Sequence, residues 1–356
     1  MSSKTLTGGP EGRLAGLDVC RGLAISLVVV HHVTGAALGS VSPTGRTFLL
    51  LLTANRLTQC VVPTFLFVSA LVFSLLVSRP FGWRRYASSR LRQLFWPYLL
   101  WTALYLGFQG LTGSGPAAGD WLVTYGDAGL LKGKGYFHLY YLLLALQLAL
   151  LFPLIRRFPW RAWPVPWVMS LAVAIQLGLY TLNLRFLHLN NVGSSVLWYV
   201  LPLALGLTLG AVPGRFERVW SRWRWEIVAA CLLALAVYLP LGFAEVLHTP
   251  LQPLAYSCGN WAYTTLAALV LGGLGTELVR RGGRVQDALG RLGQLSLQIY
   301  LLHPALLWGL ERLWFPRTTT LNLLTVALYT VLGLGLPYAL ALSLDGRRAS
   351  VWLFGR

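Results

Sequence analysis

The sequence has 356 residues, of which 56% are hydrophobic and 11% are charged, and its formal net charge is +18 at pH 7. Soluble domains usually carry about 25% charged residues, so a soluble chain of this composition could not cover its surface with polar groups. A bilayer removes that requirement, because lipid solvates an apolar exterior. The composition therefore excludes an ordinary soluble protein and predicts an integral membrane protein.

Long apolar runs follow one another along the whole chain. A helix needs about 20 mostly apolar residues to cross the hydrocarbon core of a bilayer. Runs that approach this length lie near residues 17–38, 57–78, 93–112, 136–155, 165–187, 194–212, 226–244, 256–277, 293–314 and 321–343. We therefore predict an all-α, polytopic membrane protein with about ten transmembrane helices.

The basic residues between these runs predict the topology. Every second connecting segment is basic, and 22 of the 29 Lys and Arg residues fall in that set while 7 fall in the other. Basic loops stay in the cytoplasm, which places both termini inside. We expect cytoplasmic tails over 1–16 and 344–356, a transmembrane domain over 17–343, and a location in the inner (cytoplasmic) cell membrane. The Gly- and Ser-rich segment 112–135 is expected to be an external loop that could form a partial lid.

The first apolar run carries a polar stripe. His32 follows Arg21 by eleven residues, about 16 Å of helix and close to three turns, so the two share a helix face. Asp18 lies three residues before Arg21 and can pair with it. Ionisable groups at membrane depth are costly and favour a functional site, although an interhelical hydrogen bond is the simpler role for His31, which is turned about 100° away.

A dense cationic patch precedes the third run, in RRYASSRLRQLFWPYLL. It contains four arginines, namely Arg84, Arg85, Arg90 and Arg92. The patch could simply anchor the chain to lipid phosphates. It could also bind a phosphorylated cytosolic ligand, because guanidinium groups pair with phosphate through two hydrogen bonds.

Two further groups are candidates for the site. His138 lies beside Tyr140 and Tyr141 at the start of the fourth run, and Tyr300 lies one helical turn before His303 in SLQIYLLHP. Packing is the simpler role for each group alone. The four cysteines have no metal-ligand spacing, and we see no nucleotide-binding or nucleic-acid motif, so we expect no metal and no nucleic-acid partner.

These segments together resemble the acyltransferase-3 family of membrane acyltransferases. LDVCRGLAISLVVVHH resembles its opening, an Asp-x-x-Arg-Gly element in which ten residues separate the Arg from a later His, as Arg21 and His32 do here. PTFLFVSALVF resembles the second-helix segment that ends in Ser-Gly, with Ala70 in place of the Gly. RRYASSRLRQLFWPYLL, HLYYLLLALQLALLFPLI and SLQIYLLHP resemble later segments, with Tyr140 where Trp is commoner.

The resemblance implies a standalone acyltransferase that moves an acyl group, often acetyl, from cytosolic acyl-CoA to a hydroxyl or amine. The family's acceptors include surface glycans, lipid-linked sugars, antibiotics and other lipids. In the mechanism that we expect, Arg90 and Arg92, with Arg84 or Arg85, hold the CoA phosphates, and His32 acts as general base or carries the acyl group covalently. Asp18 and Arg21 would hold each other and line the path of CoA, and Tyr300 and His303 would donate to the developing oxyanion.

Two other classes of protein fit the same residues. A transporter could use the buried His and Arg residues for proton coupling, although we detect no inverted repeat. A non-catalytic membrane scaffold would need no polar stripe in its first helix.

Overall fold

The computed structural model describes residues 10–43, 45–77, 81–314 and 319–355, and every regular element within them is helical. The prediction of an all-α protein is therefore confirmed. The chain forms two compact units, each assembled from separate stretches of sequence. Unit 1 comprises Met1–Ala70 and Val212–Ser343, and unit 2 comprises Leu71–Ala211 and Leu344–Arg356.

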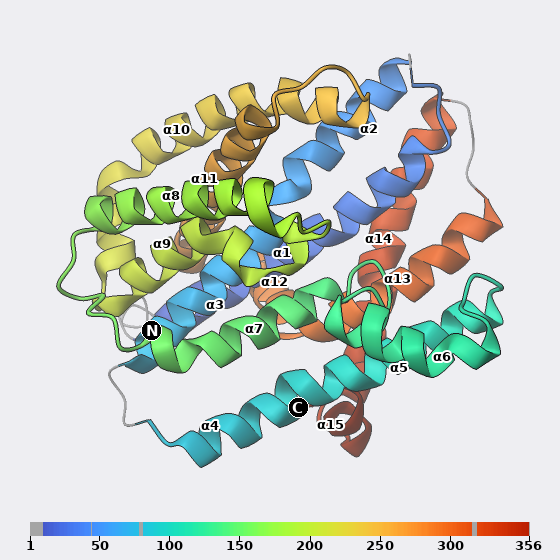
Figure 1. The fold of residues 1–356 in the computed structure, drawn as a ribbon, viewed down its shortest axis with the longest axis horizontal. Helices are drawn as coiled ribbons and strands as arrows, with labels where there is room; N and C mark the ends of the chain where they lie inside the picture. Colours follow the sequence, from blue (N-terminus) through green and yellow to red (C-terminus); the bar gives the residue numbers. More distant parts are fainter. Residues whose placement is uncertain (1–9, 44, 78–80, 315–318, 356) are drawn as a thin grey trace. The chain divides into compact units, whose positions relative to one another are not determined.

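Unit 1 is built around the first helix. Its helices are α1 (Pro10–Leu38), α2 (Arg46–Leu57), the first part of α3 (Val61–Val77), α10 (Arg215–Val246), α11 (Pro253–Arg281), α12 (Arg284–Gln294), α13 (Ser296–Leu313) and nearly all of α14 (Thr319–Leu344). Helix α1 packs against α2, α11, α12 and α13, and α10 lies along α11 (Figure 1). Val29 and Val33 of α1 meet Leu307 and Tyr329 in one buried apolar cluster.

Unit 2 contains the remaining helices. They are the end of α3, α4 (Trp83–Arg90), α5 (Trp96–Leu111), α6 (Trp121–Thr124), α7 (Tyr140–Ile155), α8 (Val165–Leu182), α9 (Val200–Ala211) and α15 (Arg348–Phe354). A π-helical turn, η2 (Leu91–Phe95), joins α4 to α5. The short C-terminal helix α15 packs against α5, where the indole N–H groups of Trp96 and Trp101 donate to the carbonyl oxygens of Trp352 and Leu353 at 2.7 and 2.8 Å.

Six helical runs in the described residues are long and apolar enough to cross a membrane. They are Leu14–Leu38, Arg46–Ser74, Val165–Leu187, Arg215–Val246, Pro253–Arg281 and Leu321–Leu344. Two shorter apolar helices, Tyr140–Ile155 and Val196–Ala211, coincide with two more of the predicted spans. The protein is thus a polytopic membrane protein, while the count of ten, the cytoplasmic termini and the division into tails and one domain stay predictions.

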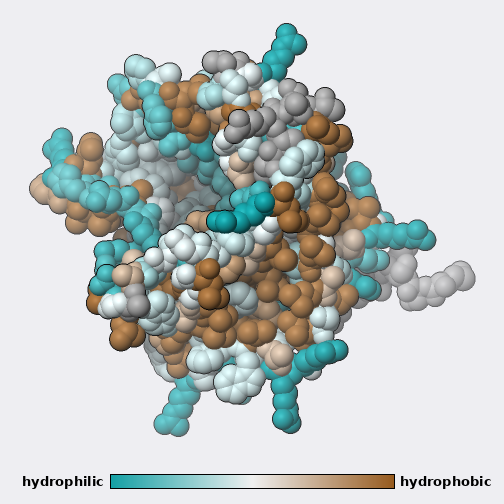
Figure 2. Space-filling view, turned by 90° about the vertical axis from the view of Figure 1, so that its right-hand side faces the viewer, coloured by the Kyte–Doolittle hydropathy of each residue, from teal (hydrophilic) through white to brown (hydrophobic). Residues whose placement is uncertain are grey.

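Large apolar side chains remain exposed on the outside of these helices, as expected for surfaces solvated by lipid. Leu150, Leu233 and Leu324 are each more than half exposed. On the face drawn in Figure 2, hydrophobic residues form broad areas, and long hydrophilic side chains project from its margins. Soluble proteins rarely expose contiguous apolar areas of this kind.

The second predicted span begins earlier than expected. Residues 46–57 form α2, and a 3-10 turn, η1 (Thr58–Cys60), connects it directly to α3. Because the predicted span began at residue 57, Arg46 and Arg56 were expected in the connecting segment before it, whereas both lie in α2. The sequence of α2, RTFLLLLTANRL, is apolar enough to join α3 in one helical run. The side chain of Arg56 is paired with Glu245 inside unit 1.

Segments predicted as connections also form helices. The expected loop over 112–135 contains η3 (Ala118–Asp120), α6 and a π-helical turn, η4 (Tyr125–Leu131), which returns along α5. There the Tyr98 hydroxyl lies 2.9 and 2.7 Å from the carbonyl oxygens of Gly129 and Leu130. Arg215, Arg218 and Arg222 lie in the first turns of α10, before a kink at Trp223, and Arg224 directly follows the kink. Among the basic residues used for the topology, Lys4, Arg79, Arg317 and Arg356 lie outside the described residues.

Candidate functional site

Helix α1 is held in unit 1 by close backbone contacts. A Cβ atom added at Gly22 would collide with the carbonyl oxygen of Leu289, and one added at Gly293 would collide with the carbonyl oxygen of Asp18. Helices α1 and α12 therefore touch through their backbones, which only glycine allows at these positions. This contact fixes the turn of α1 that carries Asp18 and Arg21.

The predicted pair of Asp18 and Arg21 is present. The Arg21 Nη1 atom lies 2.8 Å from Asp18 Oδ1, with the two residues one turn apart on α1. Both side chains are partly accessible, at 31% and 22% exposure. The pair therefore offers a polar surface at the start of α1 without leaving a buried charge unpaired.

Two histidines meet across α1 and α13. The ring of His32 stacks on that of His303 with centroids 5.3 Å apart and 27° between the planes. His303 is fully buried, and its Nδ1 lies 3.1 Å from the carbonyl oxygen of Ile299, one turn back along α13. Because a carbonyl can only accept, this hydrogen bond places a proton on Nδ1. His32 is partly buried and so more accessible than its partner.

Tyr300 belongs to the same cluster. Its ring centroid lies 6.0 Å from that of His303, and its side chain is buried. Pro304 lacks an N–H group and cannot donate the usual helical hydrogen bond to the carbonyl of Tyr300. The structure thus brings His32, His303 and Tyr300 together, and each is a group that can move or donate a proton.

His31 contacts the neighbouring helix, the simpler role that the sequence suggested for it. Its Nδ1 lies 3.0 Å from the hydroxyl of Thr58 and 3.2 Å from the carbonyl oxygen of Asn55. The Asn55 amide in turn donates to the carbonyl oxygen of His31 at 2.9 Å. These bonds tie the turn of α1 that bears both histidines to α2.

The polar contacts continue from Asn55 to α10. Arg56 Nη2 donates to Asn55 Oδ1 at 2.9 Å, and Arg56 Nη1 lies 3.2 Å from Glu245 Oε2. The Arg56 side chain is 12% exposed and that of Glu245 is 47% exposed. The sequence analysis missed Asn55 and Arg56 because it began the second helix at residue 57, and it gave no role to Thr58, which lies within that predicted helix. An Asn-Arg pair inside an apolar stretch was the available signal.

The four arginines of the cationic patch belong to unit 2 and differ in their surroundings. Arg84, Arg85 and Arg92 are exposed on α4 and η2. The guanidinium carbon of Arg90 instead lies 5.4 Å from the ring centroid of Phe73 and 5.2 Å from that of Tyr86. Three of the arginines are thus open to solvent-borne anions, and the fourth lies against aromatic rings.

His138 is buried in unit 2 within an aromatic cluster. Its ring centroid lies 4.8 Å from that of Tyr105 and 5.7 Å from that of Tyr136, both at near-perpendicular angles. This geometry is typical of aromatic packing, the simpler of the two roles considered for this group. Within the described residues, no group of three or more His, Cys, Asp or Glu side chains is placed to hold a metal ion.

The comparison with known families covers nearly the whole chain. Residues 14–342 match the family model described as an acyltransferase domain. No curated protein and no solved structure gave a significant match. The matched stretch includes Asp18, Arg21, His32, Tyr300 and His303, together with the four arginines of unit 2. The chain therefore belongs to the acyltransferase-3 family and is an integral membrane acyltransferase.

Proposed function

We propose that this acyltransferase moves an acyl group, in the first place acetyl, from cytosolic acyl-CoA to a hydroxyl of a glycan, a lipid-linked sugar or another small acceptor. The observation that supports this most is the stacked pair of His32 and His303 with Tyr300 beside it. An imidazole can both accept a proton and return it in the course of a reaction. Acyl transfer from a thioester to an alcohol needs one such group.

In the proposed reaction one proton passes from the acceptor hydroxyl to His32 and then to the CoA thiolate. His32 takes the proton of the acceptor hydroxyl as its oxygen attacks the thioester carbonyl. The tetrahedral intermediate then expels the CoA thiolate and forms the ester. The imidazolium of His32 returns its proton, so that free CoA leaves as a thiol. In the covalent variant the acyl group passes first to the His32 imidazole and then to the acceptor.

The neighbouring residues have supporting roles in this proposal. Tyr300 donates a hydrogen bond to the oxyanion, whose negative charge exists only during the reaction. His303 was predicted as a second donor, but its Nδ1–H already donates to the carbonyl oxygen of Ile299, so the neutral ring has only an acceptor left at Nε2. Asp18 and Arg21 hold each other at 2.8 Å and line the path of the CoA arm. Because both are partly exposed, they can contact a ligand without first breaking a buried network.

The exposed arginines are proposed to hold the CoA phosphates. Arg84, Arg85 and Arg92 are open to solvent and can each present a guanidinium fork to a phosphate. Arg90 was predicted with them, and that assignment stays a prediction. The Arg90 guanidinium lies over the rings of Phe73 and Tyr86, in apolar surroundings that the other three arginines do not share.

The first experiment tests the role of His32. The purified protein would be reconstituted in liposomes that contain lipids and glycans extracted from the source membrane. Radiolabelled acetyl-CoA would be added, and the label transferred to the lipid and glycan fractions would be counted. We expect His32→Ala to abolish transfer, whereas His188→Ala, at an exposed position just after a π-helical turn in unit 2, should leave it unchanged. Transfer by His32→Ala at near the wild-type rate would refute the mechanism. Label that remains on quenched protein would favour the covalent variant.

A second experiment tests the donor. Acetyl-CoA should raise the melting temperature of the detergent-solubilised protein, and AMP should not. Arg84→Gln combined with Arg92→Gln should weaken this stabilisation while leaving the melting temperature without ligand unchanged. An undiminished effect of acetyl-CoA in the double variant would mean that these arginines serve only as topological anchors.

A further inference from the structure

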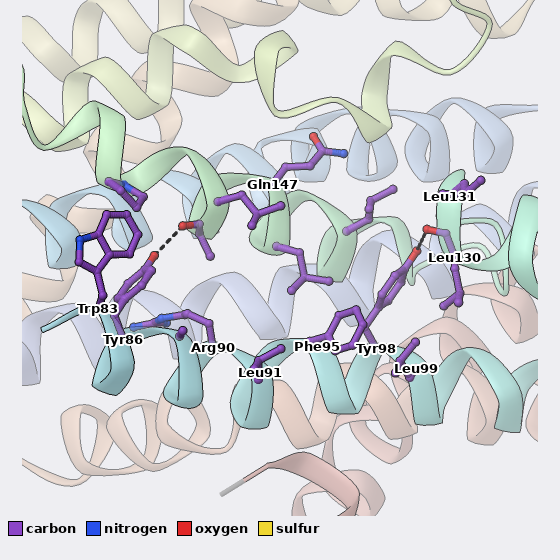
Figure 3. A pocket seen from close by; sticks show the side chains of 16 residues that line it. Trp83, Tyr86, Arg90, Leu91, Phe95, Tyr98, Leu99, Leu130, Leu131 and Gln147 are labelled. Atoms are coloured by element: carbon purple, nitrogen blue, oxygen red, sulfur yellow. Dashed lines mark hydrogen bonds between the residues drawn. The ribbon is translucent and has the colours of Figure 1, made fainter.

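Unit 2 contains an elongated groove that the proposed reaction does not use. Its volume is about 650 Å³, and it lies between the run formed by α4, η2 and α5 on one side and α7 on the other (Figure 3). Leu143, Leu146 and Leu150 of α7 line one wall. Leu131 closes the far end, beyond Tyr98. The lining is almost entirely hydrocarbon.

The polar side chains in the groove are mostly engaged with the protein. The Tyr86 hydroxyl donates to the carbonyl oxygen of Ala149 at 2.7 Å, and that of Tyr98 lies 2.7 Å from the carbonyl oxygen of Leu130 (Figure 3). Gln147 donates from Nε2 to Ser194 and accepts from the backbone N–H of Val196, at 2.9 and 2.7 Å. A ligand in the groove therefore finds few hydrogen-bonding partners among these residues.

Arg90 is the exception. Its guanidinium lies beside Tyr86 towards one end of the groove, and its Nε is buried without a hydrogen-bond partner. Within the described part of the chain, no carboxylate lies within salt-bridge distance of it. An apolar groove with a single cation and unused N–H donors is complementary to a ligand that combines a hydrocarbon chain with one anionic group.

The groove also has dimensions and a position that suit a bilayer lipid. From Tyr86 to Leu99 the helical run extends about 20 Å at 1.5 Å per residue. One leaflet contributes roughly 15 Å of a hydrocarbon core about 30 Å thick. The Arg90 end is the end nearer the basic segment that the charge pattern places in the cytoplasm, and Trp83 at that end is typical of a headgroup-level aromatic.

We propose that this groove binds one anionic glycerophospholipid of the cytoplasmic leaflet. The lipid phosphate pairs with the guanidinium of Arg90, and one acyl chain lies along α7 between Leu146 and Leu131. Leu91, Phe95 and Leu150 are more than a third exposed at the edges, so the groove opens sideways to the hydrocarbon rather than forming a closed tunnel. A lipid can enter it directly from the bilayer.

The acyl donor fits this groove less well. The pantetheine arm of acyl-CoA carries two amide groups, and each would lose its hydrogen bonds to water on entering. The groove offers almost no replacement partners, and an unpaired buried amide is costly. A plain acyl chain has no such requirement. The proposal therefore requires that Arg90 does not hold CoA, and it is independent of the roles of Arg84, Arg85 and Arg92.

Lipid binding can be measured by native mass spectrometry of the full-length, delipidated protein titrated with dioleoylphosphatidylglycerol. We expect one tightly bound lipid per wild-type chain. Arg90→Gln should weaken it roughly ten- to a hundredfold, the usual effect of losing a charged hydrogen bond. Leu146→Trp, which fills the groove, should also weaken it. The matched controls are Arg92→Gln, exposed two residues along, and Leu171→Trp, exposed on α8; both should bind as wild type does. Melting temperatures would verify that each variant is folded.

Two additional ligands distinguish the possible occupants. Dioleoylglycerol lacks the phosphate, so it should bind wild type and Arg90→Gln equally weakly. Palmitoyl-CoA should not displace the phospholipid. Equal effects of Arg90→Gln and Arg92→Gln, or wild-type affinity in Leu146→Trp, would overturn the proposal. Displacement by palmitoyl-CoA that depends on both Arg90 and Leu146 would overturn it as well, because the groove would then belong to the acyl donor.

Discussion

Asn55 donates a hydrogen bond from Nδ2 to the backbone carbonyl oxygen of His31, 2.9 Å away on the facing helix. The next residue along α1 is His32, which stacks on His303. A side-chain amide of α2 thus anchors the turn of α1 that carries the proposed general base. Asn55 is a positioning residue in this interpretation, because it acts through the backbone of His31.

Replacing Asn55 tests this anchor. Asn55→Ala should lower the free energy of unfolding by about 0.6–2 kcal/mol, the range for a lost interhelical or buried hydrogen bond. Asn55→Asp keeps the acceptor for Arg56 but loses the donor to His31, so it should also destabilise the protein. Both should lower kcat, because His32 is held less firmly. The readouts are unfolding curves and kcat of folded protein, with the exposed Asn190→Ala as the control. Wild-type kcat in both Asn55 variants would contradict a positioning role.

Replacing Arg56 and replacing Glu245, which form an ion pair, should lower the free energy of unfolding by different amounts. Arg56 is largely buried and also donates to Asn55, whereas nearly half of the Glu245 side chain is exposed. Glu245→Gln should cost less than about 1 kcal/mol, as exposed partners usually do. Arg56→Gln should cost more, since it also removes a donor to Asn55.

A double-mutant cycle of these two residues would measure their coupling through chemical unfolding. The exposed pair of Lys132 and Asp127, with both side chains about half exposed, is the control and should show little coupling. Equal costs for Arg56→Gln and Glu245→Gln would argue that Arg56 is held by Glu245 alone. The bond between Arg56 and Asn55 would then contribute little.

Much of the fold could be predicted from hydropathy because a bilayer imposes a simple rule on each crossing segment. The first predicted helix, 17–38, lies within α1, and 165–187 coincides with the run formed by α8 and the π-helical turn η5 (Asn183–Leu187). Hydropathy alone does not locate the start of a helix whose first turns are also apolar. For that reason α2 was missed, and with it the contacts that Asn55 and Arg56 make.

The candidate site was predictable where its residues share one helix. The pair of Asp18 and Arg21 follows directly from a spacing of three. The stacking of His32 on His303 joins residues 271 positions apart, and no spacing rule relates them. The surroundings of Arg90 could not be predicted either. Arginines close together in the sequence can have different environments when one of them contacts a ring on another helix, as Arg90 contacts Phe73 of α3.

Tyr300→Phe tests whether the phenol stabilises the oxyanion. The substitution removes only the hydroxyl, so the packing against His303 should persist. Losing one oxyanion donor typically lowers kcat by about 100- to 1,000-fold, with little change in KM. Tyr263→Phe is the matched control, because its hydroxyl bonds to the carbonyl oxygen of Leu57 at 2.5 Å and has no proposed catalytic role. A normal kcat in Tyr300→Phe would restrict Tyr300 to packing.

The backbone contact between α1 and α12 can be tested by two glycines of the same helix. A methyl group at Gly293 would meet the carbonyl oxygen of Asp18, and a backbone cannot yield as a flexible side chain does. At Gly290 the nearest atom is a side-chain methyl of Val19 at 3.9 Å, an ordinary van der Waals contact. Gly293→Ala should therefore push α12 away from α1 and disturb Asp18, while Gly290→Ala should be tolerated.

The two substitutions have the same intrinsic effect on helix propensity, since Ala favours a helix over Gly by about 1 kcal/mol at either position. A difference between them therefore reports the interhelical contact alone. We expect Gly293→Ala to melt at a lower temperature and to lose most acyl transfer, and Gly290→Ala to melt at or slightly above the wild-type temperature. Equal behaviour would show that α1 and α12 can separate freely. The position of Asp18 and Arg21 would then have to depend on α11, where Gly275 closely approaches Gly16 of α1.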